Sequence, residues 1–316
     1  MVRAFNPRET RILNPRAALI AQEERTDRLG ERPLTNDQVI LRRHFVGRMK
    51  ENRPNIEDFS DIYPPEKIQE DQERLRNSQE THNDPISERG KILEALVLDR
   101  IEKDNWFGES TYTVLAAEYD DRINGVDLVI EFVVDGKVER LAIDVTTAQD
   151  EEVIEKKWRS IVDPLMRKGH LTKLKYFESE ADRDIVEKES NITKGEVSMP
   201  KIILGIDTEN FDDLAKEIAS KLERGERVDL SEHFLKYDFL DLAHQQLTFL
   251  LEIAGRKAPA FKKEGIKDKL QTLVREIEKE KSKRPPQTAR IGSRNDVYGI
   301  VTNHLKRERG ERAIAA

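Results

Sequence analysis

The chain has 316 residues, of which 37% are charged and 37% hydrophobic, and its formal net charge is −7. It contains no cysteine, which excludes a disulfide framework and a thiolate metal site. No apolar run approaches the roughly 20 residues that a membrane span needs, and the N-terminus lacks the apolar segment of a signal peptide. We therefore expect a cytoplasmic protein without a membrane partner.

Charge is distributed unevenly along the chain. Residues 1–80 are neutral overall, residues 81–255 carry a net charge of −16, and residues 256–316 carry +9. This asymmetry predicts an acidic central domain followed by a basic tail. The basic segment could contact nucleic-acid phosphates or could consist of ordinary solvated helices. If the chain acts on DNA, either this segment or the N-terminal arm would hold the phosphate backbone.

The composition predicts four regions. Residues 1–84 are a charged N-terminal arm, partly helical or disordered, in which helices are expected from Asn36-Asp37 to Met49 and from Pro64-Pro65 to Glu80. Residues 85–226 form an α/β core, residues 227–284 form a helical C-terminal region, and residues 285–316 form a basic tail with room for a short helix over 297–305. A protein partner or a second copy of the chain could bind through the C-terminal helices.

The core elements are predicted in the order α-β-β-β-α-β. A helix follows Ser87, and a strand from Tyr112 to Tyr119 precedes a hairpin over 125–147. The remaining elements are a helix from Asp150 to Gly169, a short strand over 171–177, an irregular acidic segment over 178–199, a buried strand over 201–207 and a helix over 212–222. Longer helices are expected over 231–254 and 261–283. This order predicts a central mixed β-sheet flanked by helices.

The hairpin is the most informative segment. Asp135-Gly136 lies between two apolar runs, which is typical of a two-residue turn. With this turn, cross-strand partners have numbers that sum to 271, so Asp127 faces Asp144 and Glu131 faces Arg140. The opposite charges of the second pair support the register. One face is expected to be a core face and the other, acidic face to be half covered; the core face carries Val126, Leu128, Ile130, Phe132, Val134, Leu141, Ile143 and Val145.

Two opposed aspartates need compensation. Directly opposed Cβ atoms lie about 4.5–5.5 Å apart, and like charges at that distance are destabilising. A bound cation, a nearby lysine or a raised pKa on one carboxyl could offset the repulsion. The alternative is that Asp127 and Asp144 are solubilising residues at strand ends.

These residues resemble the motifs of the PD-(D/E)XK nuclease superfamily, whose members have a restriction-endonuclease-like αβββαβ core. Glu94 lies in the helical sequence GKILEALV, Gly125-Val126-Asp127 stands at the first acidic motif, and Ile143-Asp144-Val145-Thr146 stands at the (D/E)-x-K motif. The resemblance covers about residues 86–225. It implies a DNA nuclease that uses Mg²⁺ or Mn²⁺, with Asp127, Asp144 and the Val145 carbonyl as metal ligands and Glu94 as a further catalytic residue.

The chain departs from the family at Thr146, which stands where the family has its catalytic lysine. The cation could have migrated to another element, or the site could be inactive. Lys157, near the inner side of the helix that begins after Asp150, is the best replacement, and Lys173 and Lys175 are weaker candidates. An inactive nuclease-fold domain that binds nucleic acid or assembles with proteins is therefore the main alternative, and an unrelated scaffolding protein is a third.

Other site types have little support. The six histidines are scattered without paired metal-ligand spacing, and no Gly-rich phosphate-binding loop follows a strand. Trp106 and Trp158 are expected in the hydrophobic core.

Overall fold

The computed structural model describes residues 33–81, 88–147, 150–185, 191–256, 265–285 and 295–310. The chain divides into two compact units, Met1–Pro33 and Leu34–Ala316. All described residues except Pro33 belong to the second unit, whose architecture follows. None of its described helices has the length and apolarity that a bilayer crossing requires.

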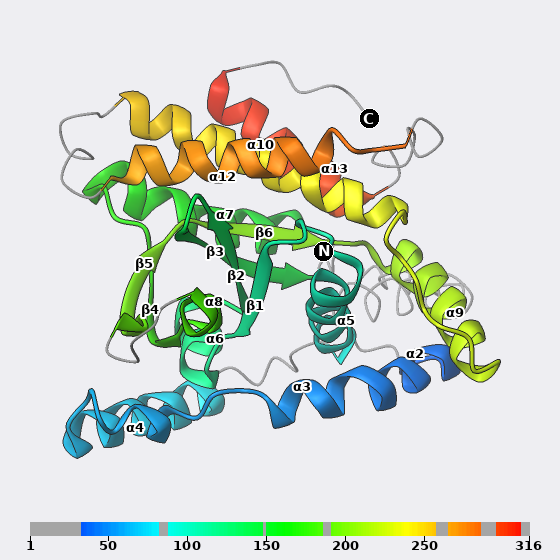
Figure 1. Ribbon diagram of the computed structural model, residues 1–316, viewed down its shortest axis with the longest axis horizontal. Coiled ribbons are helices and arrows are strands. Elements are labelled where there is room, and N and C mark those ends of the chain that lie inside the picture. Colours follow the sequence, from blue (N-terminus) through cyan, green and yellow to red (C-terminus); the bar gives the residue numbers. More distant parts are fainter. Residues whose placement is uncertain are drawn as a thin grey trace, which may run out of the picture. The chain divides into compact units, whose positions relative to one another are not determined.

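The predicted mixed sheet is present (Figure 1). It has four strands in the order β1-β2-β3-β6. Strands β1 (Thr111–Leu115), β2 (Leu128–Val134) and β3 (Lys137–Thr146) pair antiparallel, and β6 (Lys201–Gly205) runs parallel to β3. The parallel pair requires a crossover, which α7 (Glu151–Lys168) helps to make.

The hairpin register is the predicted one. Val129 pairs with Ala142, Glu131 with Arg140 and Val133 with Val138. The turn residues Asp135 and Gly136 have φ values of 50° and 73°, as a type I′ turn requires.

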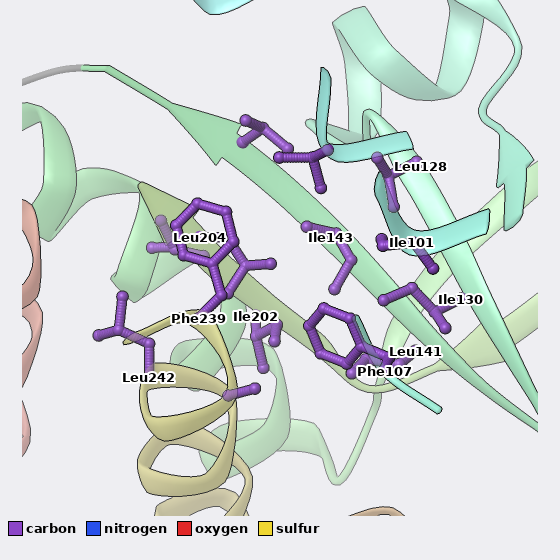
Figure 2. Close-up of a cluster of buried hydrophobic side chains, with 14 of the residues drawn as sticks. Ile101, Phe107, Leu128, Ile130, Leu141, Ile143, Ile202, Leu204, Phe239 and Leu242 are labelled. Carbon is purple, nitrogen blue, oxygen red and sulfur yellow. The ribbon is translucent and has the colours of Figure 1, made fainter. Parts of the chain in front are cut away.

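One face of the sheet packs into the main hydrophobic core (Figure 2). Leu128 and Ile130 of β2, with Ile143 of β3, are fully buried there against α5 (Glu88–Asp104) and α10 (Phe234–Arg256). Val126 was expected on this face but belongs to the opposite cluster. It precedes β2, so the strand alternation that fixes the face of Leu128 does not extend to it.

We expected the opposite face to be only half covered, but a second sheet covers it. Strands β4 (Thr172–Glu178) and β5 (Lys194–Met199) pair antiparallel and pack Leu174, Phe177 and Met199 against this face. The strand predicted over 171–177 is therefore confirmed, although it does not join the main sheet. The prediction of an irregular segment over 178–199 is wrong, because this range contains α8 (Glu180–Ile185) and β5. Apolar and polar residues alternate only weakly in β5, so the sequence does not indicate a strand there.

The crossover helix has the predicted boundaries. Asp150 caps α7 by accepting a 2.8 Å hydrogen bond from the Glu152 amide, and Gly169 ends it with φ of 66°. Trp158 lies on its buried side and Trp106 is fully buried, which confirms both as core residues. Gln246 of α10 closes the edge of the sheet by bonding the amide and carbonyl of Ile203 at 2.9 and 2.8 Å.

Further helices surround the sheets. The strand predicted over 112–119 ends at Leu115, because Glu118–Asn124 forms helix α6. The predicted helices near 212–222, 231–254 and 261–283 are confirmed as α9 (Thr208–Glu223), α10 and α12 (Ile266–Lys281). The short helix expected within the basic tail is α13 (Asp296–Arg309).

The described part of the N-terminal arm is largely helical. Helix α2 (Asn36–Leu41), the π-helix η1 (Arg42–Val46) and α3 (Gly47–Glu51) are consecutive, and Thr35, rather than Asn36-Asp37, caps them. A 3₁₀ turn (Ile56–Phe59) and α4 (Pro65–Thr81) follow. Phe59 and Ile68 pack against Tyr119 of α6 and Tyr176 of β4, so the arm is docked on the core.

Candidate acidic site at the end of the hairpin

The hairpin brings Asp127 and Asp144 to one end of the sheet. Asp127 immediately precedes β2, and its amide donates a 2.9 Å hydrogen bond to the Ile143 carbonyl. Its Oδ2 accepts a 2.5 Å hydrogen bond from the Val145 amide. Asp127 is thus fixed beside the strand that carries Asp144, and the charge of Asp144 contributes to raising the pKa of Asp127.

Two lysines contact the Asp144 carboxylate. Lys157 of α7 donates a hydrogen bond to Oδ1, and the Nζ of Lys201 lies 3.3 Å from Oδ2. The Lys157 side chain is 31% exposed, whereas that of Lys201 is 3% exposed. The predicted replacement lysine therefore lies at the site, together with a second lysine that sequence reasoning missed.

Lys201 is held in place by the chain around it. Its ammonium also donates to the carbonyls of Asn124 and Gly125 at 3.1 and 2.7 Å, in addition to its ion pair with Asp144. Gly125 ends α6 with φ of 61°, and a Cβ there would lie 3.1 Å from Lys201 Nζ. The only sequence signal for Lys201 is a lysine at the start of the otherwise apolar strand KIILG.

A second ion-paired group contains Glu94, Arg53 and Asp121. Glu94 is buried on α5, and its Oε1 lies 2.5 Å from Nη2 of Arg53. Nη1 of Arg53 lies 2.5 Å from Oδ2 of Asp121 on α6. Arg53 and Asp121 were missed because they come from an arm and a short helix that no sequence motif connects to Glu94.

The pKa values link the two groups. Burial raises the pKa of Glu94 to about 7, with Asp121 adding to the shift and Arg53 opposing it. Burial also raises the pKa of Asp127 well above its ordinary value, and the charges of Glu94, Asp121 and Asp144 raise it further. Four carboxyl groups thus share three cations, and Asp127 forms no ion pair with any described residue.

The donor set fits a cation that keeps part of its water shell. The described ranges contain no group of three Asp, Glu, His or Cys side chains that could hold a metal ion. Mg²⁺ nevertheless binds through one or two carboxylates with waters completing its octahedron. Asp127 and Asp144 can supply these carboxylates, and the cation would offset the excess negative charge while competing with the lysines for Asp144.

Lys173 and Lys175, the weaker candidates for the replacement lysine, form ion pairs elsewhere. Lys173 lies 2.6 Å from Glu196, on the exposed side of the β4–β5 sheet. Lys175 pairs with the buried Asp71 of α4. Both lysines belong to the second sheet, so their ammonium groups serve other ion pairs. Thr146 is buried, and its carbonyl accepts a 3.2 Å hydrogen bond from the Ile206 amide.

Comparison of the chain with models of protein families, with curated proteins and with solved structures finds no match. The resemblance to PD-(D/E)XK nucleases therefore depends on the motif residues and on their arrangement. The nuclease-like character of the α/β core stays a proposal.

Proposed function

We propose that the chain is a PD-(D/E)XK-like nuclease that hydrolyses DNA phosphodiester bonds with Mg²⁺ or Mn²⁺. The observation that carries the proposal is the hydrogen bond from Lys157 to Asp144. It puts an ammonium group beside the second acidic motif although Thr146 occupies the usual lysine position. The motif's chemical groups are thereby complete, with the lysine contributed by α7.

Asp127 and Asp144 would hold the metal ion, and the Val145 carbonyl is the expected third protein ligand. When bound, the ion polarises the phosphate and promotes formation of the attacking hydroxide. The Val145 amide fixes Oδ2 of Asp127. Burial and the neighbouring carboxylates raise the pKa of Asp127, and the charge of Lys157 offsets only part of this rise.

We assign different roles to Lys157 and Lys201. Burial opposes the charge of Lys157, but Asp144 and Asp127 outweigh burial and raise its pKa, so the side chain stays protonated. Its side chain is partly exposed, and in the proposed mechanism its ammonium donates to a phosphate oxygen or orients the attacking water. Lys201 is buried and bonded to two carbonyls, so it positions Asp144 and the Gly125 turn.

Glu94 is the carboxyl suited to proton exchange. Its pKa of about 7 lies near neutral pH, where a general acid–base group is most effective. Arg53 fixes its orientation through a 2.5 Å contact. We therefore assign Glu94 to proton transfer with water in the site.

A second candidate function has an observation of its own. Both oxygens of Asp144 already lie beside lysines, so the carboxylate is neutralised without a metal. This arrangement favours an inactive nuclease-fold domain that binds nucleic acid or mediates protein assembly.

A nicking assay distinguishes the two functions. Supercoiled plasmid and single-stranded DNA are incubated with Mg²⁺ or Mn²⁺ and with wild type, Lys157→Ala or Lys156→Ala. Lys156 is the exposed neighbour on the same helix and serves as the matched control. We expect Lys157→Ala to lower the cleavage rate about 100-fold or more, and Lys156→Ala to leave it within about threefold.

Calorimetry with Mn²⁺ supplies a readout that does not need cleavage. Asp127→Ala and Asp144→Ala should abolish the binding shown by wild type. If wild type binds no divalent ion, the enzyme proposal fails. DNA binding without cleavage would support the second candidate.

A further inference from the structure

The consecutive helix from Asn36 to Glu51 has two different sides. Its buried side packs into the main core through apolar residues, which are Leu41, Phe45, Val46 and Met49. Its exposed residues include four cations, which are Arg42, Arg43, Arg48 and Lys50. The helix contains the π-helical segment η1, an irregularity that is frequent at functional sites.

Three of these cations lie close together on the helix, and no described acid pairs with them. Exposed cations on other helices commonly pair with an acid one turn away, as Lys67 does with Glu70 at 2.8 Å. Arg42 pairs with Glu88 at 2.9 Å. Arg43, Arg48 and Lys50 have no acidic partner among the described residues. Three uncompensated positive charges thus lie within eight residues of one helix, in a protein of net charge −7.

The local field of this helix is positive at a neighbouring titratable group as well. Burial lowers the pKa of His44, and the charge of Arg48 lowers it further. Asp99 of α5 opposes the shift, while Lys103 and Arg100 of the same helix reinforce it. Three cations and one acid thus act on His44, and two of the cations lie on the element packed against the helix.

The same segment leads directly to the acidic site. Arg53 comes two residues after the helix ends and contacts Glu94 and Asp121. From Arg43 to Lys50 the helix rises about 10 Å. That length corresponds to about three nucleotide steps at 3.4 Å each.

We propose that the exposed side of the helix at Arg43, Arg48 and Lys50 binds the phosphate backbone of a nucleic acid and guides the strand to the acidic site. Guidance of the strand to the acidic site rests on the proposed nuclease function. Binding of the phosphate backbone does not require cleavage. An anionic membrane is a poorer partner, because the apolar side of the helix is buried in the core and cannot enter a bilayer.

The test uses the full chain with three charge reversals, Arg43→Glu, Arg48→Glu and Lys50→Glu. The matched control has three reversals elsewhere, Lys137→Glu, Lys168→Glu and Lys216→Glu. All three control lysines are exposed, form no ion pair with a described residue and lie at the hairpin turn, on α7 and on α9. Binding to a 30-nucleotide single strand and to a duplex is measured by fluorescence anisotropy in EDTA over a range of salt concentrations.

We expect the helix variant to lose at least tenfold in affinity and to lower the slope of log K against log salt by about two to three, since each phosphate contact contributes about 0.7–0.9. The control should keep the wild-type slope. Equal losses in both variants, or tighter binding of wild type to anionic lipid vesicles than to DNA, would overturn the inference.

Two further measurements separate the possible failures. Circular dichroism verifies folding, and a variant with glutamine at the same three positions replaces the glutamate variant if that one unfolds. In one outcome, the wild type cleaves no DNA in Mg²⁺ or Mn²⁺ while the helix variant still lowers the salt slope. That result would support backbone binding by the helix and contradict the nuclease proposal. Normal cleavage and an unchanged slope would contradict the surface alone.

Discussion

Two buried clusters of acids and lysines differ in how well their charges are balanced. At the acidic site, Asp144 contacts Lys157 and Lys201, while Asp127 next to it has no ion pair with a described residue. At the junction of arm and second sheet, Asp71 pairs with Lys175 and accepts a 2.7 Å hydrogen bond from Tyr176. Burial raises the pKa of Asp71, but these two hydrogen bonds outweigh it and hold the pKa below its ordinary value.

The difference fits a structural role for the Asp71 cluster and the metal-binding role that we propose for Asp127 and Asp144. The Lys175 ammonium also lies 4.9–5.8 Å from three tyrosine ring centres, so its desolvation is offset by cation–π attraction. That cluster stabilises the docked arm. In contrast, burial and neighbouring carboxylates raise the pKa values of Asp127 and Glu94, which fits the catalytic roles proposed for them.

The largest expected difference between the clusters is in stability, when one carboxylate of each is replaced by an amide. Asp71→Asn leaves the Lys175 ammonium buried without its anion, so we expect the free energy of unfolding to fall by about 3 kcal/mol. Asp127→Asn keeps an oxygen for the Val145 amide and relieves repulsion, so the free energy of unfolding should be unchanged or up to about 1 kcal/mol higher. Urea denaturation of both variants measures this.

DNA cleavage gives the complementary readout for the same pair. Asp127→Asn should abolish cleavage, whereas Asp71→Asn should retain it at a temperature where the protein is folded. A loss of stability in Asp127→Asn as large as that in Asp71→Asn would contradict the distinction between the clusters.

A second effect concerns the dependence of stability on pH. A carboxyl whose folded pKa is raised binds more protons in the folded state, so Glu94 makes the free energy of unfolding fall as pH rises from about 4.5 to about 7. The limit is about 1.4 kcal/mol per pH unit for one proton. Asp71 has the opposite sign: its contribution is present above its unfolded pKa and is lost as pH falls through the folded value.

Glu94→Gln should therefore flatten the decline of stability between these pH values and also change the pH profile of cleavage. Asp238 on α10, whose pKa burial raises to about 7, provides the control. Asp238→Asn should flatten the stability profile without moving the cleavage profile. Identical cleavage profiles for wild type and Glu94→Gln would remove Glu94 from proton transfer.

Much of the hairpin and of helix α7 could be predicted from local sequence signals. The Asp135-Gly136 turn and the Glu131–Arg140 pair determine the hairpin register, because a slip of one residue would move every side chain to the wrong face. Asp150 and Gly169 mark both ends of α7, and the spacing along that helix correctly brings Lys157 to the site. The position of Lys157 could be predicted because it lies in the second turn of α7, the helix that follows β3.

The remaining site residues depend on long-range packing that no local pattern encodes. Arg53 reaches Glu94 because the arm packs on both sides of it, through Phe45 and Met49 in the main core and through Phe59 in the cluster with α6 and β4. Lys201 reaches Asp144 because β6 pairs with β3, which places Lys201 opposite Ala142. The covering β4–β5 sheet was missed because β5 alternates only weakly between apolar and polar residues.

The smallest expected effect compares two glycines that both have positive φ. Gly136→Ala strains the hairpin turn, where an added Cβ meets nothing within 4 Å, so stability should fall by about 1 kcal/mol. Gly125→Ala carries the same backbone strain, but its Cβ lies 3.1 Å from Lys201 Nζ and 3.6 Å from Asp144 Oδ2. Thermal unfolding should therefore show a loss for both variants, somewhat larger for Gly125→Ala, while only Gly125→Ala slows cleavage, because only its methyl group displaces the ammonium that positions Asp144. Equal cleavage rates in the two variants would show that Lys201 has no part in holding the site.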